Sequence, residues 1–163
     1  MTAALLAAVV LAFPQAPAQA PPQVQVESLP LRLESWKRGG RVDLVASEQG
    51  QSATYTGVPL KAVLEAALQG KPEMEALRSL SDAVLIVQGS DGYQALVSAA
   101  AVAMDSGGKK YLLAWERDGK PLSESEGSLR LIVPGDDKRV RWVRKITAIS
   151  LVRLPKLPKP AAP

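Results

Sequence analysis

Arginines near the C-terminal end are the residues best suited to chemistry in this chain. Between Ser128 and Arg153 there are seven basic residues and two acidic ones, and the basic ones include Arg130, Arg139 and Arg141. A guanidinium group presents its N–H donors in a planar fork that matches the oxygens of a phosphate or a carboxylate. This segment therefore predicts a site for an anionic group.

Trp142 lies inside the most basic part of this segment, Lys138 to Lys145. Its indole could stack on a flat ligand or fill the core of the domain. The whole run is also compatible with a solvated basic face at the end of a strand, with Trp142 buried. For the segment alone, the second interpretation is favoured.

Two further groups of residues have weaker signals. Asp91-Gly92-Tyr93 has the composition of a turn followed by the start of a strand, and it also offers a carboxylate and a phenol. Asp136 and Asp137 follow Pro134-Gly135. Aspartates in such a turn usually accept hydrogen bonds from backbone amides, so we favour that role for them over catalysis.

Cysteine and histidine are absent from the sequence. Without histidine there is no Ser-His-Asp triad and no imidazole base. Without either residue, structural zinc, the usual haems and iron–sulfur clusters lose their normal ligands. The sequence therefore predicts no metal ligand set, and it identifies no catalytic residue.

The N-terminus has the pattern of an export signal. An apolar run, Leu5 to Phe13, is followed by Ala18-Gln19-Ala20, the small-x-small pattern that precedes a cleavage site. The run is shorter than the ~20 residues of a membrane-spanning helix. We expect a signal peptide over residues 1–20 and a periplasmic or secreted mature protein without a membrane span. An uncleaved anchor or a misplaced start codon are the alternatives.

The remaining chain is long enough for one domain. We expect a linker and first strand at 21–30, a domain at 31–153 and a disordered Pro/Lys tail at 154–163. The formal net charge of +4 is mild. It favours anionic small molecules as partners, leaves a protein partner possible, and does not by itself indicate nucleic-acid binding.

The candidate residues must be positioned by helices and strands, whose patterns alternate irregularly along the sequence. The clearest helix is predicted over Pro59 to Gln69, where leucines and valines recur at helical spacing. A second is predicted over Ala99 to Met104, capped by Ser98, and a single helical turn over Val140 to Arg144. About seven strands are predicted, at 24–29, 42–46, 83–88, 93–97, 110–116, 129–133 and 146–152. This pattern predicts a β-rich α+β domain with mixed sheets and two or three short helices.

Several motifs occur in an order that resembles a known family. They are Tyr55-Thr56-Gly57-Val58-Pro59-Leu60, Asp91-Gly92-Tyr93, Leu112 to Trp115, Asp118 to Leu122, Gly127 to Asp136 and Arg141 to Ile146. Together they resemble the oxidoreductase molybdopterin-binding domain, which has the sulfite-oxidase-like fold. The resemblance spans roughly Leu31 to Val152.

This resemblance implies a mononuclear molybdenum held by a pterin dithiolene and one protein cysteine, with oxygen-atom transfer as the usual reaction. It also implies that basic and backbone groups hold the pterin phosphate, in a segment similar to Gly127 to Trp142. The candidate cofactor-binding residues are Arg130, Arg139, Arg141, Trp142, Asp91 and Tyr93.

The missing cysteine separates two hypotheses. In the first, the protein is a non-catalytic or minimal relative that binds a pterin-type cofactor, another anionic molecule or a partner protein. In the second, it is a working molybdopterin oxidoreductase with a serine, an aspartate or solvent in place of the thiolate. We favour the first, because a thiolate sets the charge and the softness of a metal site. A periplasmic subunit that docks on an enzyme is a third possibility.

Overall fold

The computed structural model describes residues 23–70, 72–136 and 138–155. The predicted signal peptide, Asp137 and most of the predicted tail lie outside these ranges. The elements in chain order are β1 (Gln25–Leu29), α1 (Leu33–Gly39), β2 (Val42–Glu48), β3 (Gln51–Pro59), α2 (Leu60–Ala67), α3 (Glu73–Arg78), β4 (Ala83–Gly89), β5 (Gln94–Ser98), α4 (Ala99–Ala103), β6 (Leu112–Arg117), β7 (Lys120–Pro121), β8 (Arg130–Ile132) and β9 (Ile146–Arg153).

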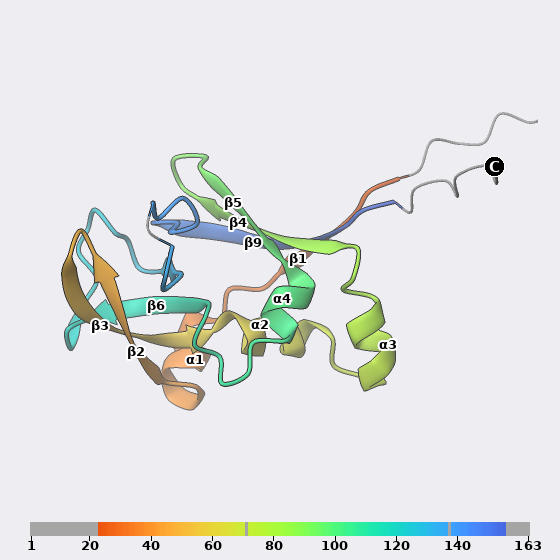
Figure 1. Cartoon of the computed structure of the whole chain (residues 1–163), viewed down its shortest axis with the longest axis horizontal. Helices are drawn as coiled ribbons and strands as arrows, with labels where there is room; N and C mark the ends of the chain where they lie inside the picture. The colour runs from red at the N-terminus through yellow and green to blue at the C-terminus, as the bar shows by residue number, and fades with distance from the viewer. Residues whose placement is uncertain (1–22, 71, 137, 156–163) are drawn as a thin grey trace, which may run out of the picture.

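The strands form two antiparallel sheets. One has the order β1-β9-β4-β5, and the other has the order β2-β3-β6-β7 with β8 paired to β6. Figure 1 shows the first sheet in the upper layer, and the second sheet together with α1 and α2 in the lower layer. The predicted β-rich α+β domain is confirmed, with four short helices in the described residues where two or three were expected. The strand pairings in these residues are antiparallel, so the expected mixed sheets are not found.

The core lies between the two layers. In β4 the buried residues alternate with half-buried ones, so Leu85 and Val87 point inward. The apolar run at 83–88 predicted a strand covered on both faces, and this is wrong because only one face packs on the core. From the second sheet, Leu113 and Leu131 are also fully buried.

Local signals placed two helices correctly. Helix α2 begins after Pro59, as its apolar spacing predicted. Helix α4 begins after Ser98, whose hydroxyl accepts a hydrogen bond from the Ala101 amide at 3.3 Å. None of the helices in the described ranges is long and apolar enough to span a membrane.

The helical turn predicted over Val140 to Arg144 is wrong. Only an isolated turn forms there, closed by a hydrogen bond from the Trp142 amide to the Arg139 carbonyl. Arg139 and Lys145 have φ values of 54° and 49°. Left-handed residues at both ends of the segment prevent a right-handed helix from continuing through it.

Strand β3 forms a hairpin with β2, and the sequence patterns did not predict it. The two-residue turn Gln49-Gly50 has φ values of 54° and 80°, which suits the twist of the strands it joins. On the other side β3 pairs with β6, with a register shift between Thr56 and Gly57. Strand β2 ends at Glu48, directly before the hairpin turn, and the candidate site lies there.

Candidate functional site, an arginine cluster around Glu48

Glu48 is the last residue of β2, and its side chain points inward. Leu44 and Ala46 precede it on the buried face of the strand, so the period of two places a carboxylate where an apolar residue is expected. The Glu48 side chain is only 9% exposed. A buried charge of this kind requires compensation by partners of opposite charge.

Four arginines and a tyrosine supply that compensation. The Glu48 Oε1 atom accepts hydrogen bonds from Arg130 Nη2 at 2.7 Å, Arg139 Nη1 at 2.8 Å and Arg144 Nη2 at 3.5 Å. The Oε2 atom accepts from the Tyr55 hydroxyl at 3.0 Å, Arg130 Nη1 at 3.2 Å and Arg117 Nη1 at 3.4 Å. We call Glu48 and these four arginines the arginine cluster.

Arg130 is the buried centre of this cluster. Its side chain is 1% exposed, and its Nη1 atom also donates to a second carboxylate, that of Glu126. The guanidinium lies over the rings of Tyr55 and Trp142, at 5.9 and 5.1 Å from their centroids. Trp142 is itself buried and donates to the Val133 carbonyl. The aromatic rings and the carboxylates together fix the Arg130 side chain.

The same contacts set the protonation states. Hydrogen bonding from Arg130 outweighs burial and lowers the pKa of Glu48 from 4.5 to about 2. Burial and the hydrogen bond to Glu48 raise the pKa of Tyr55 to about 12. Burial opposes ionisation of Glu126, but hydrogen bonds from Ser123 and the charge of Arg130 lower its pKa. At neutral pH the carboxylates of Glu48 and Glu126 are therefore ionised, and the Tyr55 phenol beside them is neutral.

The cluster has more donors than its central carboxylate can accept. A carboxylate offers about four lone-pair positions, whereas Glu48 has six donor contacts. Arg117 and Arg144 make the two longest of them. They are also the most exposed of the four arginines, at 33% and 50%. Part of their donor capacity therefore remains for another acceptor.

These two arginines face a polar pocket of about 310 Å³. It is lined by Glu48, Gln49, Gln51, Arg117, Ser123, Ser125, Glu126 and Arg144. Within the described residues, the four guanidinium groups face the carboxylates of Glu48 and Glu126 and, at 3.7 Å from Arg117, that of Asp118. These four guanidinium groups exceed the three carboxylates by one charge, whereas the pocket lining itself has two groups of each sign. An anionic ligand is favoured by the N–H donors of Arg117 and Arg144 that the carboxylates leave free.

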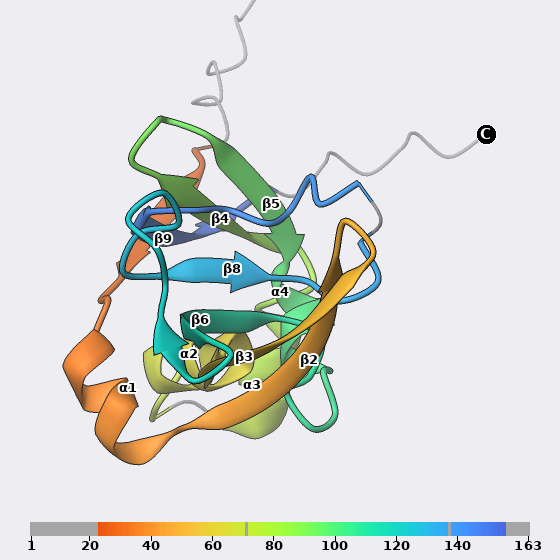
Figure 2. The ribbon, with the colours of Figure 1, turned by 90° about the vertical axis from the view of Figure 1, so that its left-hand side faces the viewer.

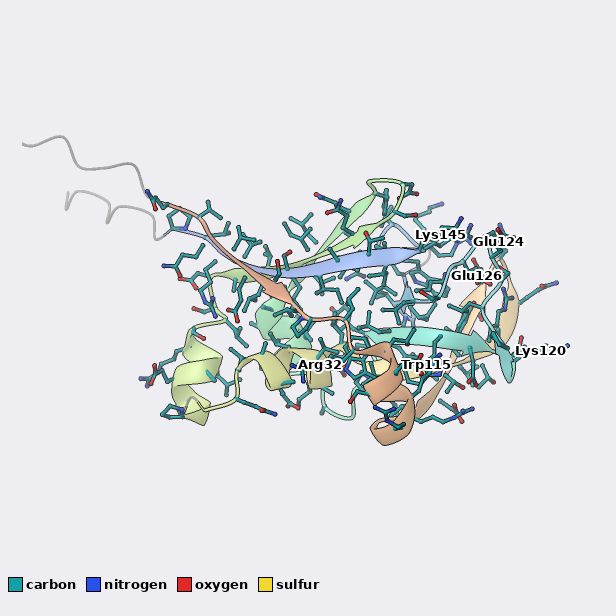
Figure 3. All side chains as sticks on the ribbon, turned by 180° about the vertical axis from the view of Figure 1, so that it is seen from behind. Arg32, Trp115, Lys120, Glu124, Glu126 and Lys145 are labelled. Carbon is teal, nitrogen blue, oxygen red and sulfur yellow. The ribbon has the colours of Figure 1, made fainter. Side chains whose placement is uncertain are left out.

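The pocket lies at the end of the molecule where the β2–β3 hairpin projects. Figure 2 views this end, where the hairpin faces the connections that lead into β8 and β9. Figure 3 shows Glu126 and Lys145 close together there. The Lys145 amide donates to the Glu126 carbonyl at 2.8 Å, so the two connections are joined through their backbones.

The structure brings together only part of the predicted site. Arg130 and Arg139 belong to the arginine cluster, and Trp142 packs beneath it. Arg141 is held elsewhere, because its amide and its Nε atom both donate to Asp136. The role of Arg141 in ligand contact stays a prediction.

Asp91 and Tyr93 also lie outside the cluster. The Asp91 carboxylate accepts a hydrogen bond from the Tyr93 amide at 2.9 Å, and the Tyr93 hydroxyl donates to the Val140 carbonyl. The first contact is the turn chemistry that the sequence allowed. The second connects the β4–β5 turn to the basic segment. Ligand binding by these two residues stays a prediction.

Sequence reasoning did not select several residues of this site, namely Glu48, Arg117, Arg144, Glu126 and Tyr55. One signal could have found Glu48: it falls on the inward face of an alternating strand, where a carboxylate requires a cationic partner. Nothing local identifies Arg117 as that partner, because the two residues meet only through the β2–β3–β6 pairing.

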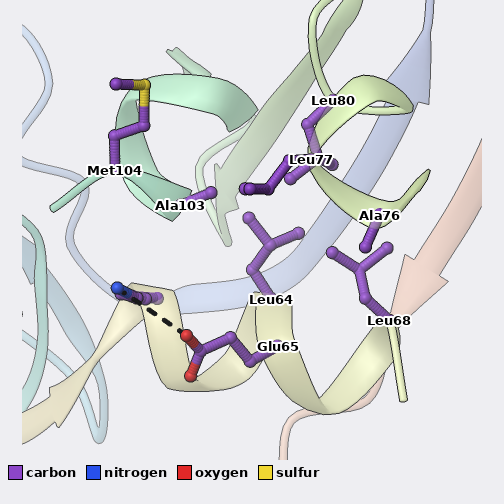
Figure 4. A pocket seen from close by; sticks show the side chains of 9 residues that line it. Leu64, Glu65, Leu68, Ala76, Leu77, Leu80, Ala103 and Met104 are labelled. Atoms are coloured by element: carbon purple, nitrogen blue, oxygen red, sulfur yellow. Dashed lines mark ion pairs between the residues drawn. The ribbon is translucent and has the colours of Figure 1, made fainter. Parts of the chain in front are cut away.

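A larger pocket of about 470 Å³ lies elsewhere, between α2, α3 and α4. Figure 4 shows its mainly apolar lining, including Leu64, Leu77 and Met104, with the Lys61–Glu65 ion pair at its rim. The sequence-predicted basic residues do not line it. We place the candidate site at the smaller pocket because charged groups converge there.

Residues 35–154 match the family model of the oxidoreductase molybdopterin binding domain. The chain belongs to this family. The match includes every residue of the arginine cluster and most of the range over which the sequence resembles it. No curated protein shows a significant match to the chain.

The residues of this molybdopterin-binding domain do not fit the metal that the family implies. The sequence has no cysteine to supply a thiolate, and no group of three or more acidic, histidine or cysteine residues in the described ranges could hold a metal ion. At the arginine cluster the free groups are guanidinium donors, which have no lone pair to offer a cation. The same donors do fit a phosphate or another anionic group.

Proposed function

We propose that this protein is an exported, non-catalytic member of the molybdopterin-binding oxidoreductase family that binds an anionic ligand at the arginine cluster. The ligand is a small phosphate-bearing molecule or the phosphate end of a pterin-type cofactor. One observation carries the proposal: Arg117 and Arg144 retain donor capacity and face a polar, solvent-open pocket.

The composition supports the non-catalytic part of the proposal. In the family, a protein cysteine holds the molybdenum, and this sequence contains none. Among the residues that line the pocket, the ionised oxygen atoms that could ligate a metal belong to Glu48 and Glu126. Both carboxylates already bind Arg130. A carboxylate is also a harder ligand than a thiolate, so it does not reproduce the same metal site.

Export is supported by the sequence of residues 1–20. The expected outcome is a mature chain that begins at Pro21 and is recovered outside the cytoplasm. Intact-mass measurement of the protein from a secreting bacterial host checks this. Recovery of the full-length chain from the cytoplasmic fraction would contradict export and would leave the ligand proposal unaffected.

The family match supports a second candidate function, an active molybdopterin-dependent oxidoreductase with a non-cysteine metal environment. Purification from a molybdenum-replete host followed by elemental and pterin analysis separates the two. We expect molybdenum far below one atom per chain. Stoichiometric molybdenum together with bound pterin would overturn the non-catalytic assignment.

Ligand binding is tested by thermal shift with phosphate, pterins, nucleotides and sulfonates. A ligand that binds only the folded state raises the melting temperature in proportion to its affinity and concentration. We expect stabilisation by phosphate-bearing compounds and none by uncharged pterins or nucleosides. Stabilisation by the uncharged compounds alone would place the ligand at a different site, such as the apolar pocket between the helices.

A further inference from the structure

Glu48 occupies the position that a bound anion would take in the arginine cluster. Its two oxygens accept from Arg117, Arg130, Arg139 and Arg144 at distances between 2.7 and 3.5 Å. This is the coordination expected of an anionic ligand surrounded by guanidinium forks. Here the protein supplies that anion itself, from the end of β2.

The contacts of Glu48 fall into an inner and an outer set. Arg130 is fully buried and is shared with Glu126, so it stays with the protein core. Arg117 and Arg144 make the long contacts and line the pocket. An anion that enters from solvent meets the outer arginines first, and Glu48 is the group with which it must share them.

We propose that Glu48 is an internal competitor for the arginine cluster and thereby the specificity-determining residue of the site. An incoming anion binds by taking over the Arg117 and Arg144 guanidinium groups, and the Arg139 group where it reaches far enough. This inference rests on the proposed function, because it concerns the same site.

Competition of this kind sets a threshold for ligands. An internal ligand lowers the apparent affinity of every external anion, because an anion binds only to the fraction of molecules in which the internal ligand has released the arginines. A monoanion such as acetate offers no more charge than Glu48 does. A dianion such as phosphate attracts two guanidinium groups more strongly, so it remains bound at concentrations where acetate does not. The site is therefore selective for dianionic groups.

The test uses the mature protein and two simple probes, inorganic phosphate and acetate, titrated calorimetrically at low ionic strength. Glu48→Gln keeps the length and the acceptor oxygen of the side chain but removes its charge. We expect the variant to bind phosphate about tenfold more tightly than the wild type does, and to bind acetate measurably. The matched control is Glu116→Gln, which breaks an exposed ion pair with Arg41 and should leave both affinities unchanged.

Glu48→Asp provides a second variant in case Glu48→Gln does not fold. It keeps the charge but shortens the side chain by one methylene, so its hold on the outer arginines weakens and phosphate affinity rises by a smaller factor. Phosphate affinity that is unchanged or lower in every folded Glu48 variant overturns the inference, because Glu48 would then organise the arginines for the ligand.

The inference and the proposed function fail in different ways. If the wild type binds phosphate through Arg117 and Arg144 while the Glu48 variants bind no more tightly, only the inference is overturned. If the wild type binds no anion but Glu48→Gln does, the competitor role is supported and the proposed ligand function of the wild type is overturned. Absence of binding in both overturns both.

Discussion

Glu48 contributes a buried charge to the fold and lies at the proposed ligand site. Its carboxylate is buried at the end of a strand, and four guanidinium groups keep it ionised. Removing one member of a buried ion pair leaves an uncompensated charge, which is more costly than the pair is stabilising. The site therefore depends on the whole group of residues rather than on any single arginine.

The ionisation of Glu48 predicts an acid limit to stability. Its pKa falls from 4.5 to about 2 on folding, so the folded state favours the charged form. The resulting stabilisation is fully present above pH 4.5 and is lost as the pH falls toward 2. Since one pKa unit corresponds to about 1.4 kcal/mol, the loss is roughly 3 kcal/mol.

Urea unfolding at a series of pH values measures this loss. The same series on Glu48→Gln should show a flatter dependence between pH 4.5 and pH 2, because the variant has no carboxyl to titrate at this position. Parallel curves for the two proteins would contradict the shift at Glu48.

Individual residues were predicted from the sequence only where their neighbours gave a signal. Arg130 and Arg139 were grouped as parts of one basic segment, and both side chains donate to Glu48. Arg141 was grouped with them, yet its side chain pairs with Asp136. The segment contains left-handed turns, so adjacent arginines point to different places, and sequence spacing could not show which ones converge.

Among the elements, the β2–β3 hairpin and its pairing to β6 position the site. At the register shift in this pairing, β3 approaches β6 so closely that a Cβ atom on Gly57 would lie 2.1 Å from the Leu113 carbonyl oxygen. Gly57 belongs to the motif Tyr55 to Leu60 by which the sequence resembles the family. Its role is steric, since only glycine allows this contact between the strands.

Gly57→Ala should therefore destabilise the fold severely. The clash is with backbone atoms, which cannot move aside as a flexible side chain would, and we expect a loss of roughly 3 kcal/mol or more. Chemical denaturation monitored by tryptophan fluorescence measures it. Gly39→Ala is the matched control, because a Cβ at Gly39 meets nothing within 4 Å, and its stability should change by less than about 1 kcal/mol. Equal stability of the two variants would contradict the steric role.

The elements that the sequence predicted well are those with local signals. Helix α2 has apolar spacing after a proline, and α4 has a serine cap. Strand β3 was missed because it begins with the polar, exposed residues Gln51 and Ser52 and alternates weakly after them. Helices α1 and α3 were missed because neither has a side-chain cap, and α1 buries no residue completely. Tertiary contacts rather than local propensity stabilise these elements.

At the scale of the whole molecule, two antiparallel sheets pack against each other, and the connections into β8 and β9 meet the β2–β3 hairpin at one end. The order of several weak motifs predicted this family correctly, although no single motif was decisive. The order of the motifs indicated the fold because the motifs contact one another across distant segments of the chain. The close approach of Gly127 to Lys145 is one such contact.

This chain belongs to the molybdopterin-binding family but has no cysteine to supply the thiolate that the family implies for molybdenum. Its candidate site is instead a carboxylate surrounded by arginines. The central claim is that Arg117 and Arg144, at the pocket, bind an anionic ligand.

Calorimetric titration of phosphate into the wild type and into the double variant Arg117→Ala/Arg144→Ala tests that claim most directly. Glu48 keeps its short contacts to Arg130 and Arg139 in the variant, so the fold should remain intact. Each charge-assisted hydrogen bond lost costs about 1.5–3 kcal/mol, so we expect phosphate affinity to fall more than tenfold. Arg41→Ala, which removes an exposed arginine that pairs with Glu116 outside the pocket, should bind as the wild type does. Unchanged affinity in the double variant, or an equal loss in Arg41→Ala, would contradict the account.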